Sequence, residues 1–262
     1  MPGHAGKFCY GMKKLMITLV YSFVCALVFG QDANLLFKEG LNLERQLKDV
    51  EAVDKYQQAA AADPKNIAVL VKCAEIYCNI GGRQTKNVDK QNNYLSAQQF
   101  AGQALAIDSN SADANYAMAL VLDKTLELET KNERILELER QIKSYTNKAL
   151  ALNPNHARAN FLDGKWNFDM LNISLVKRVE AKTLFKKFPD PDIDSAIFYM
   201  EKCRSLEQYF VPNYLYLAKA YRSKNRPAQA IEVLGKLVKL PTRTPNDLPI
   251  KAEGQQMLSE MQ

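Results

Sequence analysis

A small residue, a large apolar residue and an alanine recur along this chain at the offsets of a 34-residue helix–turn–helix unit. The clearest copy runs from Ala33 to Asn66. Gly40 and Ala52 allow two antiparallel helices to approach closely, and Pro64 ends the second helix because it lacks a backbone donor. The small, large, small, large, small and helix-stop positions of this copy are Gly40, Leu43, Ala52, Tyr56, Ala59 and Pro64.

Four further copies follow, and this spacing resembles the tetratricopeptide repeat. Three of them carry extra residues between their two helices. In the second copy, the polar stretch from Gly81 to Asn92 predicts a surface loop. In the third copy, leucines and isoleucines at helical spacing predict longer helices instead. In the fourth copy, the added length leaves room for a short helix near residues 173–188.

We therefore predict an all-α, tetratricopeptide-repeat-like helical solenoid with inter-helix insertions and about five helix pairs. Apolar residues make up 47% of the chain, which is enough to form a continuous core. The stretch from Leu248 to Met261 has a weak helical pattern and is expected to cap the last apolar face. The predicted solenoid domain covers residues 31–262.

The N-terminus has the pattern of an export signal. Met12-Lys13-Lys14 precedes an apolar stretch from Leu15 to Phe29, and Gly30 offers a small residue for cleavage. We predict a signal peptide over residues 1–30, cleaved after Gly30, with Met12 as an alternative start. The expected location is the periplasm or cell envelope of a bacterium. An uncleaved membrane anchor formed by residues 15–29 is the alternative.

Charge and cysteine content exclude other classes of protein. The formal net charge is +6, and loss of residues 1–30 would remove three lysines and leave about +3, which is too small to indicate a nucleic-acid partner. Three cysteines, Cys73, Cys78 and Cys203, would remain in the exported part. Cys73 and Cys203 fall at packing positions, so free buried thiols are expected rather than a disulfide.

Residues for catalysis or metal binding are scarce, so we predict a protein that is not an enzyme and has no cofactor or metal. The sequence has two histidines, His4 and His156, and His156 lies in a turn between repeats, where a capping or surface role is expected. Asp190, Asp192 and Asp194 resemble the start of a calcium loop. The glycine and terminal glutamate of that loop are missing, which favours a helix N-cap.

The segment from Ile173 to Phe188 predicts an amphipathic basic helix. In one interpretation Val176, Val179 and Leu184 pack on the neighbouring repeat while the lysines face water. In the other, the helix contacts anionic lipid or an acidic partner. Asn172-Ile173-Ser174 is also a glycosylation sequon, relevant in a eukaryotic host.

Several stretches carry a resemblance to a known family. They are Ala149 to Asn155, Gly164-Lys165-Trp166, the run from Asn213 to Tyr221, and the ending from Leu240 to Asp247. Together with the irregular repeats, they look like the regulator of microtubule dynamics family of tetratricopeptide proteins. Animal members of that family are associated with microtubules and with contacts between mitochondria and the endoplasmic reticulum. The resemblance implies the fold, whereas the export signal predicts a bacterial, envelope-located relative with a different partner.

The predicted function is a non-catalytic scaffold that binds a partner protein or peptide in the groove formed by the first helices. Cations and aromatic rings there favour a peptide that carries acidic residues. A chaperone adaptor is not expected, because Phe37 and Leu41 replace the polar residues that clamp a terminal carboxylate. A membrane tether and a small-ligand protein that uses the inserts are the alternatives. The predicted groove residues are Glu75, Asn79, Tyr116, Arg158, Phe161, Lys165, Lys219 and Arg222.

Overall fold

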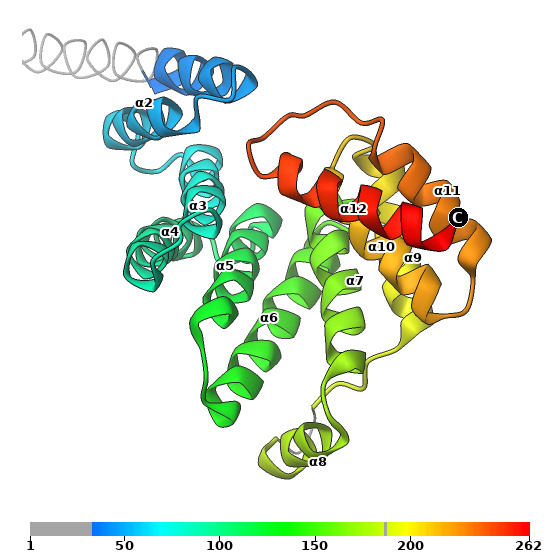
Figure 1. Cartoon of the computed structure of the whole chain (residues 1–262). Helices are drawn as coiled ribbons and strands as arrows, with labels where there is room; N and C mark the ends of the chain where they lie inside the picture. Colours follow the sequence, from blue (N-terminus) through cyan, green and yellow to red (C-terminus); the bar gives the residue numbers. More distant parts are fainter. Residues whose placement is uncertain (1–32, 186–187) are drawn as a thin grey trace, which may run out of the picture.

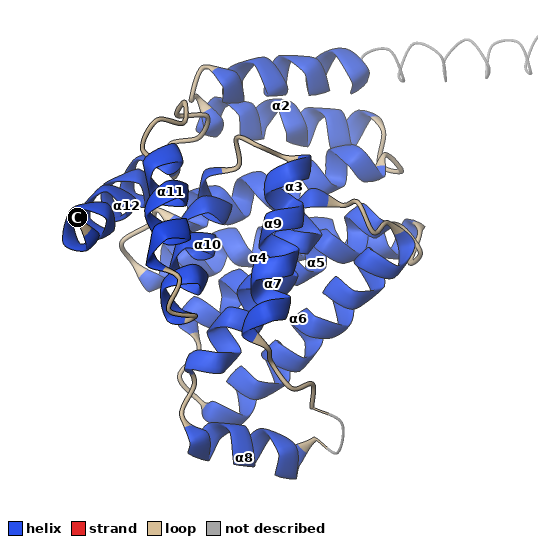
Figure 2. Cartoon of the chain, turned by 90° about the vertical axis from the view of Figure 1, so that its right-hand side faces the viewer, coloured by secondary structure: helices blue, strands red, loops and turns tan. Residues whose placement is uncertain are grey.

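The computed structural model describes residues 33–185 and 188–262, which form helices joined by turns. No strand occurs in these two ranges, as Figure 2 shows. The predicted boundary at Gly30 and the apolar stretch at residues 15–29 lie outside the described residues. Within the two ranges, the all-α prediction is confirmed.

The helices stack as antiparallel pairs, and the first helices of successive pairs lie side by side (Figure 1). This arrangement confirms the predicted solenoid. The pairs are residues 33–45 with α2 (Asp49–Ala62), α3 (Ile67–Gly82) with α4 (Asn87–Ile107), α5 (Ala112–Thr125) with α6 (Asn132–Leu152), α7 (Ala157–Asn172) with α9 (Ile193–Leu206), and α10 (Val211–Ser223) with α11 (Pro227–Leu237). The 3-10 turn η1 (Leu126–Leu128) lies between α5 and α6, α8 (Leu175–Leu184) lies between α7 and α9, and α12 (Asp247–Met261) ends the chain.

Small residues bring the helices of a pair together as the sequence predicts. Ala52 and Ala196 are fully buried between paired helices. A methyl group on Gly40 would lie 2.5 Å from a ring carbon of Tyr56, and one on Gly164 would lie 2.6 Å from the Met200 side chain. Glycine is therefore required at both positions by the short distance between the helices rather than by the backbone conformation.

Three of the turns between repeats have the same construction, which fixes the angle at which the next pair begins. In each turn an Asp or Asn accepts a hydrogen bond from the backbone N–H two residues later. The residue after that caps the following helix through its side chain. The two positions are Asp63 and Asn66, Asp108 and Ser111, and Asn153 and His156.

The capping predictions for the remaining polar residues are also confirmed. Nδ1 of His156 accepts a hydrogen bond from the backbone N–H of Ala159 at 3.0 Å. Asp192 accepts one from Ser195 at the start of α9. The described cysteines are free and buried, and burial raises the pKa of Cys73 and of Cys203 to about 12, so these thiols stay protonated at neutral pH.

The predicted surface loop from Gly81 to Asn92 is wrong. The residues between α3 and α4 that are not helical span only 83–86, and α4 begins at Asn87. Gly81 packs under Tyr94, where a methyl group would lie 2.5 Å from the ring. The glycine therefore serves helix packing, and the polar run that follows it is the solvent-facing start of a long helix.

The predicted packing of the inserted basic helix is also wrong, although the helix itself is confirmed as α8. The side chains of Val176 and Val179 are 76% and 66% exposed, and Leu184 is 44% exposed. Ala181, on the opposite side of the helix, is buried. The helix thus contacts the body of the protein through Ala181 and turns Val176 and Val179 outward.

The predicted capping helix is α12, which packs against α10 and α11. A methyl group on Gly254 would lie 2.3 Å from Leu237, so this helix lies very close to α11. The start of α12 reaches back to α3 (Figure 1). Because Asn246, just before α12, bonds to α3 while α12 packs on the last pair, the stack curves toward the face that α3, α5, α7 and α10 share (Figure 1).

Candidate functional site

A buried carboxylate on α3 joins three successive first helices. Glu75 accepts a hydrogen bond from the Tyr116 hydroxyl on α5 at 3.0 Å. Its same oxygen lies 2.9 Å from the Arg158 guanidinium on α7. The structure therefore brings together three of the predicted groove residues. Tyr116 and Arg158 lie 41 and 83 positions after Glu75 in the sequence.

The contacts continue on both sides of Glu75 as a chain of alternating charges. Lys72 lies 3.3 Å from Glu75 and 3.0 Å from Glu44 of the first pair. Arg158 donates two hydrogen bonds, of 3.2 and 3.1 Å, to the carboxylate of Glu207. We call Glu44, Lys72, Glu75, Arg158 and Glu207 the ion ladder. Its members lie on the first, second and fourth helix pairs, and Tyr116 of the third pair donates a hydrogen bond to Glu75.

Glu75 and Arg158, which are neighbours in the ion ladder, are both charged at neutral pH. Burial alone would raise the pKa of Glu75, but Arg158 and Lys72 outweigh it and lower the pKa to about 2. The Glu75 carboxylate in turn raises the pKa of Arg158. An ion pair of this kind holds its geometry only while both partners are present.

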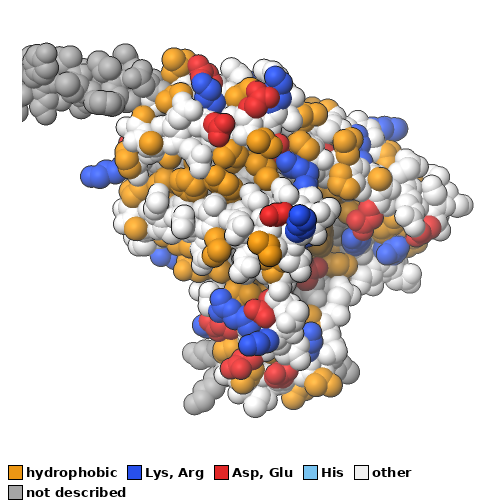
Figure 3. All heavy atoms as spheres, turned by 60° about the vertical axis from the view of Figure 1, so that its left-hand side comes forward, with side chains coloured by type: hydrophobic (Ala, Val, Ile, Leu, Met, Phe, Trp, Pro, Cys, Tyr) orange, Lys and Arg blue, Asp and Glu red, His pale blue; other side chains and the backbone are white. Residues whose placement is uncertain are grey.

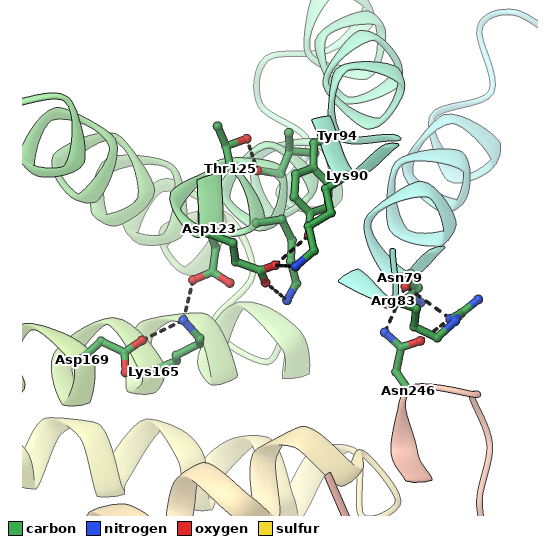
Figure 4. Close-up of polar contacts among 12 residues, drawn as sticks. Asn79, Arg83, Lys90, Tyr94, Asp123, Thr125, Lys165, Asp169 and Asn246 are labelled. Atoms are coloured by element: carbon green, nitrogen blue, oxygen red, sulfur yellow. Dashed lines mark hydrogen bonds and ion pairs between the residues drawn. The ribbon is translucent and has the colours of Figure 1, made fainter. Parts of the chain in front are cut away.

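A second group of predicted residues gathers around Tyr216 on α10. The ammonium groups of Lys165 and Lys219 lie 5.4 and 5.3 Å from the centre of its ring, within cation–π range. Lys165 also lies 2.7 Å from both Asp123 and Asp169 (Figure 4). We call these five residues the tyrosine cluster.

Phe161 joins the ion ladder to the tyrosine cluster. Its ring lies 5.1 Å from that of Phe210 and 5.7 Å from that of Tyr216, edge to face in both cases. Phe210 in turn lies under Arg158, at 5.1 Å from the guanidinium carbon. The two groups therefore form one continuous strip of charges and aromatic rings along the first helices.

Two predicted residues contact the chain's own C-terminal segment. The backbone carbonyl of Asn79 accepts a hydrogen bond from the Asn246 amide at 3.1 Å, and Arg83 also bonds to Asn246 (Figure 4). Arg83 bonds in addition to Asp49 at the start of α2. Lys219 lies 2.6 Å from Glu253 of α12. The predicted groove is thus bordered by α12.

Arg222 stands apart from the other predicted residues. Its side chain is exposed near the end of α10 and forms no ion pair with a described residue. The other predicted cations, Arg158, Lys165 and Lys219, are each paired with carboxylates. On the face shown in Figure 3, basic and acidic side chains are likewise intermingled.

Sequence reasoning missed several members of the strip. Lys72 and Tyr216 each lie three residues before a predicted residue on the same helix, and this spacing could have indicated them. Asp123 and Glu207 are separated from their cations by 42 and 49 residues. For these two, the sequence carries no local signal.

Glu139 on α6 lies close to the tyrosine cluster. Among the described residues, no cation forms an ion pair with it. Its side chain is 9% exposed. Burial, with the nearby carboxylates of Asp123 and Asp169, raises the pKa of Glu139 to about 8, although Lys165 opposes the shift. The folded protein therefore holds this carboxyl protonated at pH 7.

Glu139→Gln is expected to make the protein relatively more stable as the pH rises. A pKa raised by folding stabilises the native state fully below the unfolded value of 4.5 and ceases to do so as the pH passes about 8. Between pH 5 and pH 8 the difference in free energy of unfolding, variant minus wild type, should grow by at least about 2 kcal/mol. Urea unfolding across this range measures it. Glu133→Gln, at an exposed position of the same helix, is the control, and a similar growth there would contradict the assignment.

Two kinds of feature are absent from the described part of the chain. It contains no group of three or more His, Cys, Asp or Glu side chains that could hold a metal ion. Within the same ranges, no helix has the length and apolar character needed to span a bilayer.

Comparison with known proteins identifies the family. The family model described as "Regulator of microtubule dynamics protein 1-3" matches residues 32–262. The chain belongs to the regulator of microtubule dynamics family. The resemblance predicted from the sequence is therefore confirmed.

Relatives within the family are distant. The regulator of microtubule dynamics protein 1 of Caenorhabditis elegans is 23% identical over 72% of this chain and 80% of the relative. Protein 1 of Mus musculus is 27% identical over 67% of this chain, and protein 2 of Homo sapiens is 28% identical over 45%. The match spans 58% of the mouse protein and 29% of the human one. This family member therefore corresponds to only part of those two relatives.

Solved structures confirm the fold. A thermophilic tetratricopeptide-repeat protein of Thermus thermophilus superposes with a TM-score of 0.60 at 15% identity, covering 87% of this chain and 99% of that one. The type IV pilus biogenesis factor PilW gives a TM-score of 0.52 at 19% identity, covering 87% and 90%. The repeat fold and the family together suggest a protein-interaction scaffold.

Proposed function

We propose that this family member is a non-catalytic scaffold that binds a partner protein or peptide along the face shared by its first helices. The observation that carries the proposal is the continuous strip formed by the ion ladder, Phe161 and the tyrosine cluster. It combines fixed charges with aromatic rings, which are the features that give peptide-binding surfaces their specificity. Six of the predicted groove residues belong to or contact this strip: Glu75, Tyr116, Arg158, Phe161, Lys165 and Lys219.

The partner is expected to carry acidic residues, which would replace the exposed carboxylates that are paired with the cations of the strip. Glu207 and Glu253 are 34% and 54% exposed, whereas Glu75 and Asp123 are 11% and 10% exposed. Water screens the ion pairs that the exposed carboxylates form and so weakens them. The carboxylates of a ligand can therefore replace these side chains beside the cations. Arg222, which is exposed, adds a cation at the end of the strip.

Affinity capture with the full chain tests the proposal. The double variant Lys219→Glu, Arg222→Glu should retain about tenfold less of an acidic partner than wild type, because it reverses the charge at one end of the strip. Glu207→Gln with Glu253→Gln should instead retain more, because it frees Arg158 and Lys219.

Lys148→Glu with Lys239→Glu is the matched control, since both lysines are exposed and lie outside the strip. This pair makes the same change in net charge and should leave capture unchanged. The same partners captured in equal amount by the Lys219, Arg222 variant would refute the groove assignment. Weaker capture by the glutamine variant would refute the acidic partner.

Export to a bacterial envelope, with cleavage after Gly30, is part of the same proposal. Its support is the sequence pattern of residues 12–30. N-terminal sequencing of the protein from its own cells tests it, and Gln31 is the expected first residue. An intact N-terminus in the membrane fraction would favour the tether anchored by residues 15–29.

A small-ligand protein is the second candidate, and one hollow favours it. A cavity of about 600 Å³ lies between α6 and the region that follows α8, lined by Arg140, Lys143, Leu184 and Phe185 among others. Arg140 and Lys143 are paired with Glu137 and Asp163, so a small organic anion would bind here by sharing these cations and contacting the two apolar side chains. A rise in melting temperature with such a compound, lost in Ser144→Trp at the cavity wall, would support this candidate.

A further inference from the structure

The outer face of α8 is an unpartnered apolar surface. Val176, Val179 and Thr183 are exposed and lie on one side of the helix at helical spacing, opposite the buried Ala181. The two valines are more than 60% exposed. Exposed apolar side chains that are contiguous on a helix indicate a surface that contacts something other than water.

The position of α8 leaves this face accessible. The helix packs mainly against α6 and projects from the end of the molecule (Figures 1 and 2). It is an insertion between the two helices of the fourth pair, so the repeat stack is complete without it. A flat surface could therefore approach α8 without meeting the rest of the solenoid at that end.

The charges around the apolar face are mainly positive. The ten residues of α8 include three basic residues and one acidic residue. Lys182 lies 2.7 Å from Asp190, but these side chains are 60% and 77% exposed, so water screens the pair and leaves it weak. Lys182 lies three residues after Val179, at the edge of the apolar face, whereas Lys177 lies four residues before the buried Ala181, nearer the covered side of the helix.

We propose that α8 docks this protein onto the surface of an anionic phospholipid bilayer. Helices that lie in the headgroup region combine an apolar face, buried by roughly 5–10 Å, with lysines or arginines that contact the phosphates. The two valines form a shallow face without aromatic anchors, which suits such insertion better than a deep protein groove. The proposal does not depend on the partner-binding strip.

Tryptophan fluorescence on the full chain provides a local test. The chain has a single tryptophan, Trp166, which is buried and serves as an internal reference. Val179→Trp places a second tryptophan on the apolar face of α8. Val50→Trp is the matched control, because Val50 is 67% exposed on α2 and Val179 is 66% exposed. Both variants keep the same N-terminus, so any binding through residues 1–32 affects them equally.

The probe is vesicles of brominated phosphatidylcholine with roughly 30% phosphatidylserine. The emission of Val179→Trp should shift to the blue and be quenched, while that of Val50→Trp should not change. Adding Lys182→Glu to Val179→Trp should reduce the quenching, and pure phosphatidylcholine vesicles should produce little. Equal quenching at both positions, no quenching at position 179, or equal quenching on neutral vesicles would each overturn the proposal.

Discussion

Gly164→Ala is expected to lower the free energy of unfolding by about 2–3 kcal/mol. The added methyl group would lie 2.6 Å from the Met200 side chain, 2.9 Å from the carbonyl oxygen of Ala196 and 3.2 Å from the backbone nitrogen of Met200. The side chain can move, but the backbone of α9 cannot do so without separating the two helices. Alanine would otherwise favour the helix, so the predicted loss is due to the close approach alone.

Urea unfolding of wild type and variant measures this difference. Gly102→Ala is the control, because Gly102 lies inside α4 and a methyl group there would meet no heavy atom within 4 Å. That substitution should stabilise the protein by about 0.5–1 kcal/mol. Two Gly→Ala changes are thus expected to have opposite signs. A neutral or stabilising effect at Gly164 would show that α7 and α9 are farther apart than the structure has them.

Arg158→Met is the second large effect, with an expected loss of about 2–3 kcal/mol at pH 7. Methionine keeps much of the side-chain volume but leaves Glu75, which is 11% exposed, without its strongest partner. Because folding lowers the pKa of Glu75 to about 2, the ion pair stabilises the fold above pH 4.5 and stops doing so as the pH falls toward 2. The loss should therefore shrink in acid.

Unfolding experiments at pH 7 and pH 3 check both parts of this prediction. Arg140→Met is the control, since the Arg140–Glu137 pair is more exposed, at 45% and 25%, and its loss should cost less than about 1 kcal/mol. Adding Glu75→Gln to Arg158→Met should recover part of the stability, because it removes the unpaired charge. A loss that is the same at both pH values would contradict the role of Glu75.

The repeat fold could be predicted from the sequence because its signals are local. Small residues 12 positions apart, as at Gly40 and Ala52, report an interhelical contact directly. The same signal misled at Gly81, whose neighbour Gly82 suggested a turn. The packing partner of Gly81 is Tyr94, 13 positions later, and a glycine in a turn has the same sequence appearance as one under a ring.

The candidate site could be predicted only in part, because its partners are distant in sequence. Helical offsets identified Glu75, Tyr116 and Arg158 as residues on the shared face. They could not show that Glu207 would meet Arg158, since that contact depends on the angle between two repeats. For α8, periodicity identified an apolar face, but which face the body covers depends on where the flanking loops place the helix. Partner binding at the strip stays a prediction.

The hydrogen bonds between Asn246 and α3 change how the molecule can respond to force and to heat. In an open repeat array, the terminal units can unfold one at a time, and the superhelix can be extended at a small cost in free energy. Here α12 packs on the last pair, and its first residues are tied to the second pair. Hydrogen bonds therefore join the C-terminal segment of the array to its second helix pair. Contacts within the chain fix the curvature of the array, and the C-terminal pair cannot unfold without breaking the contact between Asn246 and the second pair.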